Sequence, residues 1–351
     1  MRSHKKIVVA VATGFLALTA ESSPDSPNLL YVSGKKTKMS STDTYWDYVK
    51  FQPDSSRLFM ARVGDGLTVF DVDKSQLVAT IDNSVGANGP LLLPQFDRGY
   101  VAMNDGSMLT FALRSLKTLS RVSLNADGLN SGIYDAATRN IHMISAEGPA
   151  ETIWYSFDAA SGRKLGATRF PFRKMDDPAT DGKGSIFAPA RFDNIILRLD
   201  SVTLKETARW SVGCNVSKVR YQQSTGRIIG ACVGDAPVMF ALDPQRGEVT
   251  ARIPIGRGLD ALVIDDARHR IVTSNGSDGT LSVIAQESPD RYRLLGNVNT
   301  TPGARMMDID QRTGRLYMVN ADSTQFLDAE TGKRKRHYHP NTFSVQAYLP
   351  Q

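Results

Sequence analysis

The strongest constraint on the fold is a short turn that recurs seven times along the chain, about 43 residues apart. Each copy joins two short apolar strands through a cluster of Asp, Pro, Ser, Thr or Gly and a basic or Gly residue. The first large apolar residues after these turns are Leu58, Tyr100, Ile141, Ile186, Ile228, Ile271 and Leu316. A fixed period of this length is typical of a propeller or a solenoid.

Every repeat has the pattern of β-strands, and helical periodicity is nearly absent. Residues 216–221 alternate apolar and polar side chains, as in a half-buried strand, whereas residues 227–232 are largely apolar and suit burial on both faces. Residues 243–247 have the composition of a tight turn. We therefore predict an all-β fold, a seven-bladed β-propeller of four-stranded antiparallel blades, with a β-sandwich of accidental spacing as the alternative. The blades should start near residues 45, 88, 130, 176, 215, 259 and 304.

The first 20 residues have the layout of a secretory signal peptide. Arg2, Lys5 and Lys6 precede an apolar run over residues 7–20, and residues 21–24 interrupt that run. The run is short for a membrane span, and no Cys follows it, which argues against a bacterial lipoprotein. We expect cleavage after Ala20, with Ser22 as the alternative, and a periplasmic or secreted protein. An uncleaved N-terminal anchor is the other interpretation.

Loss of this leader would change the charge of the working chain. The full sequence has 42 Lys and Arg residues against 36 Asp and Glu residues, and three of the bases lie in the leader, which leaves 39 against 36. This small excess supports solubility and gives little indication of nucleic-acid binding. Since 41% of the residues are hydrophobic and no low-complexity linker divides the chain, we expect residues 21–351 to form one domain with a large core.

The two cysteines, Cys214 and Cys232, are candidates for a disulfide. An even number of cysteines in an exported chain favours one. Cys214 precedes the first strand of the fifth repeat and Cys232 ends the second, so antiparallel pairing would bring both to the same rim. Two buried free thiols are the alternative, and a metal site is disfavoured because no His lies near either Cys in the sequence.

Parts of the repeat are similar to a known family. Residues 271–275, Ile-Val-Thr-Ser-Asn, together with residues 279–284, resemble the Tyr-Val-Thr-Asn repeat of the YVTN or YncE-like propellers. Residues 46–48 and 303–305 resemble the openings of that family's first and seventh blades. The resemblance covers the chain after the leader. It implies an exported seven-bladed binding or scaffold protein, commonly without an assigned reaction, and the motif specifies fold more strongly than activity.

The resemblance also implies how the ring closes. Residues 306–309 and 316–320 are clear first and second strands of the seventh repeat, and the sequence then becomes irregular. By the resemblance, residues 343–348 form the third strand and residues 29–33 the outer one, so that both ends of the chain share a blade without a free edge. The other interpretation takes residues 324–328 as the third strand.

The residues that open each blade form the candidate ligand-binding set. They should converge on the central channel, at the face that carries the loops between second and third strands, such as residues 191–194 and 275–278. Carboxylates, amides, a guanidinium and an indole could together bind a cation, an amine or a sugar. The simpler interpretation is a polar lining for a water-filled channel. The set is Trp46, Asp47, Asn88, Asn130, Asp176, Asn215, Asp260 and Arg305.

A basic segment stands out near the C-terminus. Lys333, Arg334, Lys335 and Arg336 are followed by residues 337–339, His-Tyr-His. If the ring closes as the resemblance implies, this segment is an excursion over the channel face that could bind phosphate, nucleic acid or another anionic surface. A solvated loop is the alternative, and two His residues do not by themselves make a zinc site.

Signals of catalysis are weak, and we expect no catalytic residues. The chain has no Gly-x-Ser-x-Gly, His-Glu-x-x-His or Cys-x-x-Cys-His pattern. The enzymatic alternative is a calcium-dependent lactonase or esterase, because Asp47, Asn130, Asn215 and Asp260 could imitate the calcium-holding Glu, Asn and Asp set of gluconolactonase-type propellers. Our principal expectation is a monomeric, non-enzymatic protein without a cofactor or a membrane span after the leader. It would engage a protein or a small molecule at the channel face.

Overall fold

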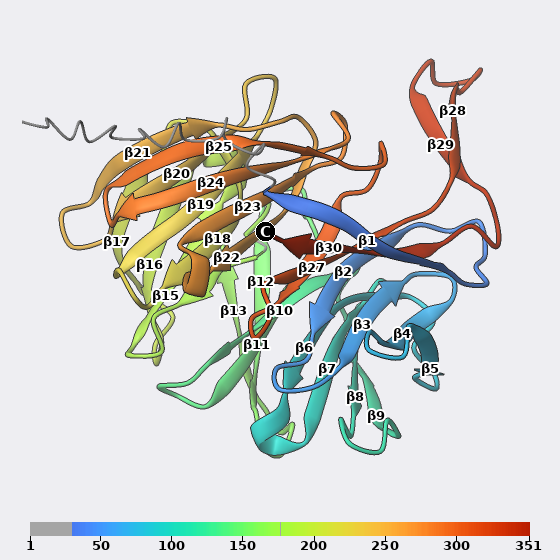
Figure 1. Ribbon diagram of the computed structural model, residues 1–351. Coiled ribbons are helices and arrows are strands. Elements are labelled where there is room, and N and C mark those ends of the chain that lie inside the picture. The colour runs from blue at the N-terminus through green and yellow to red at the C-terminus, as the bar shows by residue number, and fades with distance from the viewer. Residues whose placement is uncertain (1–29, 176) are drawn as a thin grey trace, which may run out of the picture.

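The computed structural model describes residues 30–175 and 177–351. The proposed leader and its cleavage site lie outside the described residues, as does Asp176. Within the described part, the strands form seven four-stranded antiparallel sheets arranged as the blades of a ring (Figure 1). The prediction of an all-β, seven-bladed propeller is therefore confirmed. No helix within these residues is long and apolar enough to cross a bilayer.

Blades 1 to 6 are each built from four consecutive strands, the first at the channel and the fourth at the periphery. The strands of blades 1 to 3 are β2 (Trp46–Phe51), β3 (Arg57–Arg62), β4 (Gly66–Asp71), β5 (Gln76–Thr80), β6 (Ala87–Leu93), β7 (Arg98–Met103), β8 (Ser107–Phe111), β9 (Thr118–Ser123), β10 (Leu129–Asp135), β11 (Asn140–Ser145), β12 (Thr152–Asp158) and β13 (Lys164–Phe170). The strands of blades 4 to 6 are β14 (Ala179–Thr180), β15 (Ser185–Ala190), β16 (Ile195–Asp200), β17 (Glu206–Ser211), β18 (Asn215–Gln222), β19 (Arg227–Val233), β20 (Val238–Asp243), β21 (Glu248–Pro254), β22 (Leu259–Asp265), β23 (Arg270–Asn275), β24 (Thr280–Ser288) and β25 (Arg291–Asn299). In the part of the chain that the structure describes, three short 3-10 helices join strands: η1 (Pro94–Phe96), η2 (Arg191–Asp193) and η3 (Asp266–Arg268).

The predicted blade starts agree closely with the first strands, and blade 4 differs most. Its first strand, β14, spans two residues and begins at Ala179 rather than near residue 176. Lys174 therefore lies in a loop and not in the sheet.

Blade 7 is assembled from both ends of the described chain. Its strand order is β1 (Tyr31–Lys38), β30 (Ser344–Pro350), β27 (Arg315–Asn320) and β26 (Met306–Asp310). Tyr31 pairs with Pro350 on one side of β30, and Leu316 pairs with Tyr348 on the other. This arrangement confirms the ring closure implied by the family resemblance.

Residues 324–328 do not form the third strand of blade 7. Instead, β28 (Ser323–Leu327) pairs with β29 (Arg334–Tyr338) in a separate hairpin that projects from the ring (Figure 1). The physical reason is burial: Val345 and Tyr348 of β30 are 3% and 4% exposed, whereas β28 consists mainly of exposed side chains. The basic segment predicted as an irregular excursion is therefore mostly regular β-strand.

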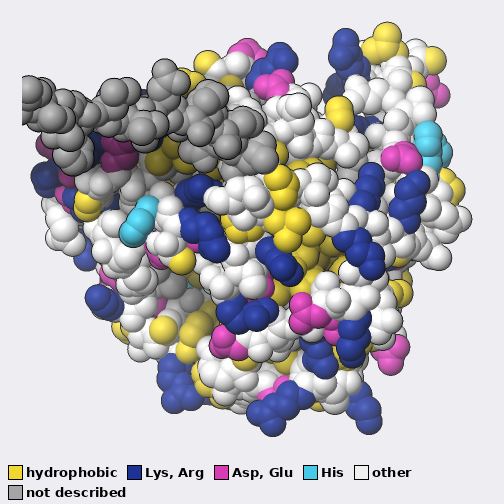
Figure 2. Space-filling model, in the orientation of Figure 1, with side chains coloured by type: hydrophobic (Ala, Val, Ile, Leu, Met, Phe, Trp, Pro, Cys, Tyr) yellow, Lys and Arg dark blue, Asp and Glu magenta, His cyan; other side chains and the backbone are white. Residues whose placement is uncertain are grey.

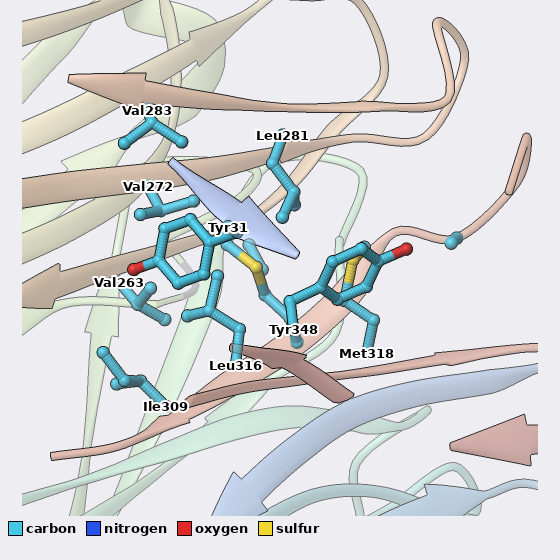
Figure 3. Close-up of a cluster of buried hydrophobic side chains, with 12 residues drawn as sticks. Tyr31, Val263, Val272, Leu281, Val283, Ile309, Leu316, Met318 and Tyr348 are labelled. Carbon is cyan, nitrogen blue, oxygen red and sulfur yellow. The ribbon is translucent and has the colours of Figure 1, made fainter. Parts of the chain in front are cut away.

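The core consists of apolar clusters between neighbouring blades. Because successive side chains of a strand point to opposite faces, the inner strands must be apolar on both faces to pack against two neighbours. Figure 3 shows the cluster where blade 6 meets blade 7, with the ring of Tyr31 from β1 among side chains of both blades. Burial of each such side chain stabilises the fold by about 1.5–3 kcal/mol. The labelled members are Tyr31, Val263, Val272, Leu281, Val283, Ile309, Leu316, Met318 and Tyr348.

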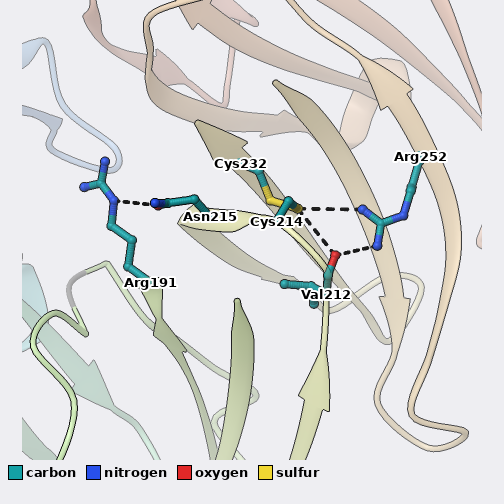
Figure 4. The surroundings of a disulfide bond; sticks show 6 residues. All are labelled: Arg191, Val212, Cys214, Asn215, Cys232 and Arg252. Carbon is teal, nitrogen blue, oxygen red and sulfur yellow. Dashed lines mark hydrogen bonds between the residues drawn. A yellow bond between two sulfur atoms is a disulfide. The ribbon is translucent and has the colours of Figure 1, made fainter. Parts of the chain in front are cut away.

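A disulfide joins Cys214 and Cys232 in blade 5, with their Cα atoms 5.9 Å apart. Cys214 lies just before β18, and Cys232 lies in β19 opposite Val216, as antiparallel pairing requires. Arg252 of β21 covers the bond and donates a hydrogen bond to the carbonyl of Val212 (Figure 4). The disulfide thus fixes the start of a channel-lining strand.

Candidate ligand site in the central channel

A repeated irregularity of the first strands shapes the channel. In five blades the pairing of the first and second strands shifts register near the start of the first strand, and such a bulge re-aims the side chains beside it. The shifts lie between Trp46 and Val49, Ala87 and Gly89, Leu129 and Ser131, Val216 and Lys218, and Leu259 and Ala261.

These strands surround a cavity of about 610 Å³ at the mouth of the channel. Its volume lies in the range of about 300–1,000 Å³ that is usual for small-molecule sites. Blades 1, 5, 6 and 7 contribute most of the wall, and the β28–β29 hairpin adds two side chains. The lining consists of Tyr45, Asp47, Tyr48, Asn130, Lys174, Arg191, Ser217, Lys218, Gly258, Leu259, Asp260, Gly276, Ser277, Gly303, Arg305, Arg336 and Tyr338.

Of the seven predicted residues that the structure describes, four reach this cavity. Asp47, Asn130, Asp260 and Arg305 line it. Trp46 does not: its side chain is 1% exposed, and its ring lies 4.8 Å from that of Tyr338, centroid to centroid, within the core between blades 1 and 7. The expectation for Trp46 is wrong because neighbouring residues of a strand point to opposite faces.

Two predicted amides lie behind the cavity wall and hold other groups. Asn88 is buried, and its Nδ2 donates to the carbonyl of Leu129 at 3.1 Å. The Oδ1 of Asn215 accepts a hydrogen bond from Nε of Arg191 at 3.0 Å (Figure 4). Asn215 thereby orients a guanidinium that does line the cavity. Asp176 lies outside the described residues.

A charged network forms the floor of the cavity. Asp260 is held by two cations, since its Oδ2 lies 2.9 Å from Nη1 of Arg305 and its Oδ1 lies 3.8 Å from Nζ of Lys218. Lys218 is 3% exposed, and its Nζ also lies 3.4 Å from Oδ2 of Asp177 and 4.9 Å from the centroid of the Tyr48 ring. The carboxylates of the floor are thus neutralised by internal bases.

The network continues into a second cavity of about 260 Å³ deeper in the channel. There the Oδ1 of Asp177 accepts a hydrogen bond from Nη1 of Arg220 at 2.9 Å. Burial alone would raise the pKa of the Asp177 carboxyl, but Arg220 and Lys218 outweigh it and hold the pKa at about 2. Burial lowers the pKa of Lys50 in the same space, and the Asp308 carboxylate opposes that shift.

The charges that line the outer cavity favour an anion over the cation or amine considered from the sequence. Among the described lining residues, Asp47 and Asp260 are outnumbered by the bases Lys174, Arg191, Lys218, Arg305 and Arg336. A positive, partly enclosed site attracts negative ligands.

The residues proposed for calcium do not assemble as a ligand set. Asn215 is turned to Arg191, and Asp260 is paired with Arg305 and Lys218. Calcium needs six or more oxygens with carboxylates among them. Within residues 30–175 and 177–351, no group of three or more His, Cys, Asp or Glu side chains is arranged to hold a metal ion.

The basic segment divides between the cavity and the solvent. Arg336 lines the cavity beside Tyr338, Lys335 forms an ion pair with Asp328 inside the hairpin, and Lys333 and Arg334 are exposed. Figure 2 shows basic and hydrophobic side chains together on the projecting hairpin. One of the four bases is therefore part of the candidate site.

Sequence reasoning missed the charged residues within the first strands. Lys218 and Arg220 alternate along β18, which places them on one face, and that face looks into the channel. The sequence did contain a signal for them. Charged residues at alternate positions of a first strand share one face, and since a propeller buries the other face of that strand, the charged face must line the channel. Arg336 carried no comparable signal, since its place depends on how the hairpin folds back.

Comparisons with known proteins support the fold. Neither a family model nor a curated protein matches the sequence. A chain of a solved structure described as a mitotic checkpoint complex superposes with a TM-score of 0.67 at 11% identity, and the match covers 94% of this chain and 100% of that one. A chain of Kuenenia stuttgartiensis hydrazine synthase gives a TM-score of 0.66 at 10% identity and covers 89% and 99%. At such identities the likeness shows a shared propeller fold, which hosts many functions.

Proposed function

We propose that the chain is an exported, non-enzymatic propeller of the YVTN or YncE-like kind that binds a small ligand in the outer channel cavity. The observation that supports this proposal is the cavity itself, a concave space of about 610 Å³, within the usual size range of ligand sites, on which charged and aromatic side chains converge. The leader-like N-terminal sequence supports export. A role as a protein scaffold would use the same channel face, with the projecting hairpin as part of the contact.

A thermal-shift screen tests ligand binding. The purified chain would be heated with sugars, lactones, nucleotides, amines, organic acids, calcium and short oligonucleotides. A ligand at a hundred times its Kd adds about 2.7 kcal/mol to the free energy of unfolding, which raises Tm by several degrees.

Two matched variants locate any ligand that the screen finds. Ser277 is exposed at the cavity mouth, so Ser277→Trp should fill the entrance and remove the shift. Ser211 is exposed on the outer strand of blade 4, so Ser211→Trp should leave the shift intact. Equal shifts in both variants would place the ligand elsewhere and contradict the proposal.

Export is tested separately by expressing the full sequence in a bacterial host and weighing the protein recovered from the envelope by mass spectrometry. Cleavage after residue 20 or 22 is expected. A full-length chain confined to the cytosol would contradict export and leave ligand binding to be judged on its own data.

A further inference from the structure

We infer that the outer cavity binds a compact organic anion carrying at least two negative charges, and that the projecting hairpin supplies one of its binding groups through Arg336. The inference rests on the proposed function, because it names the ligand class of the same cavity. The anion can carry carboxylates or phosphates, since guanidinium groups bind both in the same planar, bidentate geometry.

Three guanidinium groups from distant parts of the chain line the cavity. Arg191 comes from η2 in blade 4, Arg305 from the turn before β26, and Arg336 from β29 of the hairpin. Two of them are held in place by the protein. The Nε of Arg191 donates to Asn215, and the Nη2 of Arg305 donates to the carbonyl of Trp46 at 2.9 Å. Such fixed donors favour binding, because little conformational entropy is lost when the ligand arrives.

Donor capacity is left over after these contacts. Among the described residues, the guanidinium group of Arg336 donates no hydrogen bond and forms no ion pair, and the buried Nε of Arg305 also lacks an acceptor. Gly303 makes room for Arg336, since a Cβ at that glycine would lie 2.5 Å from Nη1 of the arginine. A half-buried guanidinium without an acceptor is costly in free energy unless water or a ligand supplies one.

The internal carboxylates do not use up this positive charge. Asp260 is shared between Arg305 and Lys218, Asp47 also acts electrostatically on Arg305, and Asp177 lies deeper, with Arg220. Among the described residues, Arg191 and Arg336 form no ion pair with a carboxylate. One negative charge on a ligand could face only one or two of the three arginines. Because Arg305 already faces Asp260, a ligand with two negative charges would match the two remaining guanidinium groups, those of Arg191 and Arg336. The cavity volume of about 610 Å³ suits a small molecule.

Calorimetric titration with citrate, succinate and fructose 1,6-bisphosphate tests the inference on the purified chain. Acetate and glucose are the controls for charge number and for charge itself. At least one polyanion should bind more tightly than both controls. If citrate binds more tightly than the bisphosphate, the cavity prefers carboxylates, and the reverse order indicates a preference for phosphates. If none of the three polyanions binds, the inference is overturned.

The hairpin offers a matched pair of variants. Arg336→Gln should weaken binding about tenfold or more, because a charge-assisted hydrogen bond is lost. Arg334→Gln removes the same charge from the same strand, two residues away and exposed, and should change affinity less than about twofold. Arg336→Lys should restore part of the affinity. Equal weakening by Arg334→Gln and Arg336→Gln would mean that the surface charge of the hairpin attracts anions generally, which contradicts a cavity site.

Two further results separate this inference from the proposed function. If a neutral compound binds in a manner blocked by Ser277→Trp while the polyanions do not bind, the cavity is a ligand site and the anion inference fails. If a ten-nucleotide DNA strand binds more tightly than the small anions and both arginine variants weaken it equally, the hairpin is a nucleic-acid surface and the anion inference also fails.

Discussion

The two sides of the central channel use the same strand position in opposite ways. Where blades 2 and 3 meet, the bulge position of β6 holds Asn88, which bonds to Leu129, and a Cβ on the next residue, Gly89, would lie 2.5 Å from the Asn130 carbonyl oxygen. The strands are closed against each other there. Between blades 5 and 7, the bulge position of β22 holds Asp260, which lies between Lys218 and Arg305 at the edge of an open cavity.

The comparison shows that the repeat decides where a side chain points, whereas the residue type decides whether the channel closes or opens there. A neutral amide and a glycine allow close packing, because they add neither charge nor bulk. Paired charges keep a polar, hydrated space, because each must stay near a partner or water. A few residues of the first strands can thus convert a structural ring into a site.

The largest loss of stability is expected when the Asp177 carboxylate, which neutralises the bases on the open side of the channel, is removed. Asp177→Asn leaves Arg220 and the buried Lys218 without their shared carboxylate, and breaking such a buried pair costs about 3–5 kcal/mol of the free energy of unfolding. Urea denaturation at pH 7 measures it. The exposed Asp193→Asn is the control and should stay within about 0.5 kcal/mol. A small effect of Asp177→Asn would show that the network is solvated and that the two sides differ less than the contacts indicate.

Lowering the pH should reversibly remove the contribution of the Asp177 carboxylate to the free energy of unfolding. The pKa of Asp177 is about 2 in the folded chain and about 3.9 when unfolded. Its contribution is therefore complete above about pH 5 and is lost as the pH falls through 4 towards 2, because the unfolded state then binds more protons. The shift corresponds to about 2.6 kcal/mol. In urea denaturation at pH 6, 5, 4 and 3, the gap between the native chain and Asp177→Asn should narrow, and a constant gap would contradict the assignment.

The closed side predicts a steric effect in place of an electrostatic one. Gly89→Ala would push a methyl group against the Asn130 carbonyl and should cost about 1–3 kcal/mol. Gly166→Ala is the control, since a Cβ there meets no atom within 4 Å. Thermal unfolding of both variants measures the difference. Equal Tm values would mean that blades 2 and 3 can separate without loss.

Much of this architecture could be predicted from the sequence because it follows from repetition. The seven apolar residues that follow the repeated turns, from Leu58 to Leu316, indicate the number of blades. The family resemblance predicts the seventh blade that both ends of the chain share. Both are local patterns that recur, so each copy supports the others. The closeness of Cys214, just before β18, to Cys232 in the adjacent antiparallel strand β19 followed from the same register.

The site was harder to predict because it depends on side-chain directions beside the bulges and on contacts between distant segments. Neighbouring residues of a strand point to opposite faces, so Trp46 turns into the core while Asp47 lines the cavity, and the register shift that follows changes this alternation. Arg336 reaches the cavity because the β28–β29 hairpin, inserted between β27 and β30, folds back over it. No local sequence pattern indicates that the hairpin takes this position. Side-chain direction at an irregular strand and contacts between distant segments require the folded structure.

The smallest predicted difference in stability is between two asparagines, Asn88 and Asn215, which lie near the start of a first strand on the closed and the open side of the channel. Asn88→Ala removes a buried hydrogen bond and leaves the Leu129 carbonyl without that donor, so it should cost about 1–2 kcal/mol. Asn215→Ala should cost only about 0.5 kcal/mol, because its partner Arg191 faces the cavity and can turn to water. Urea denaturation resolves the two. A larger loss for Asn215→Ala would mean that the open side is as tightly packed as the closed one, and the contrast between them would then lie in charge alone.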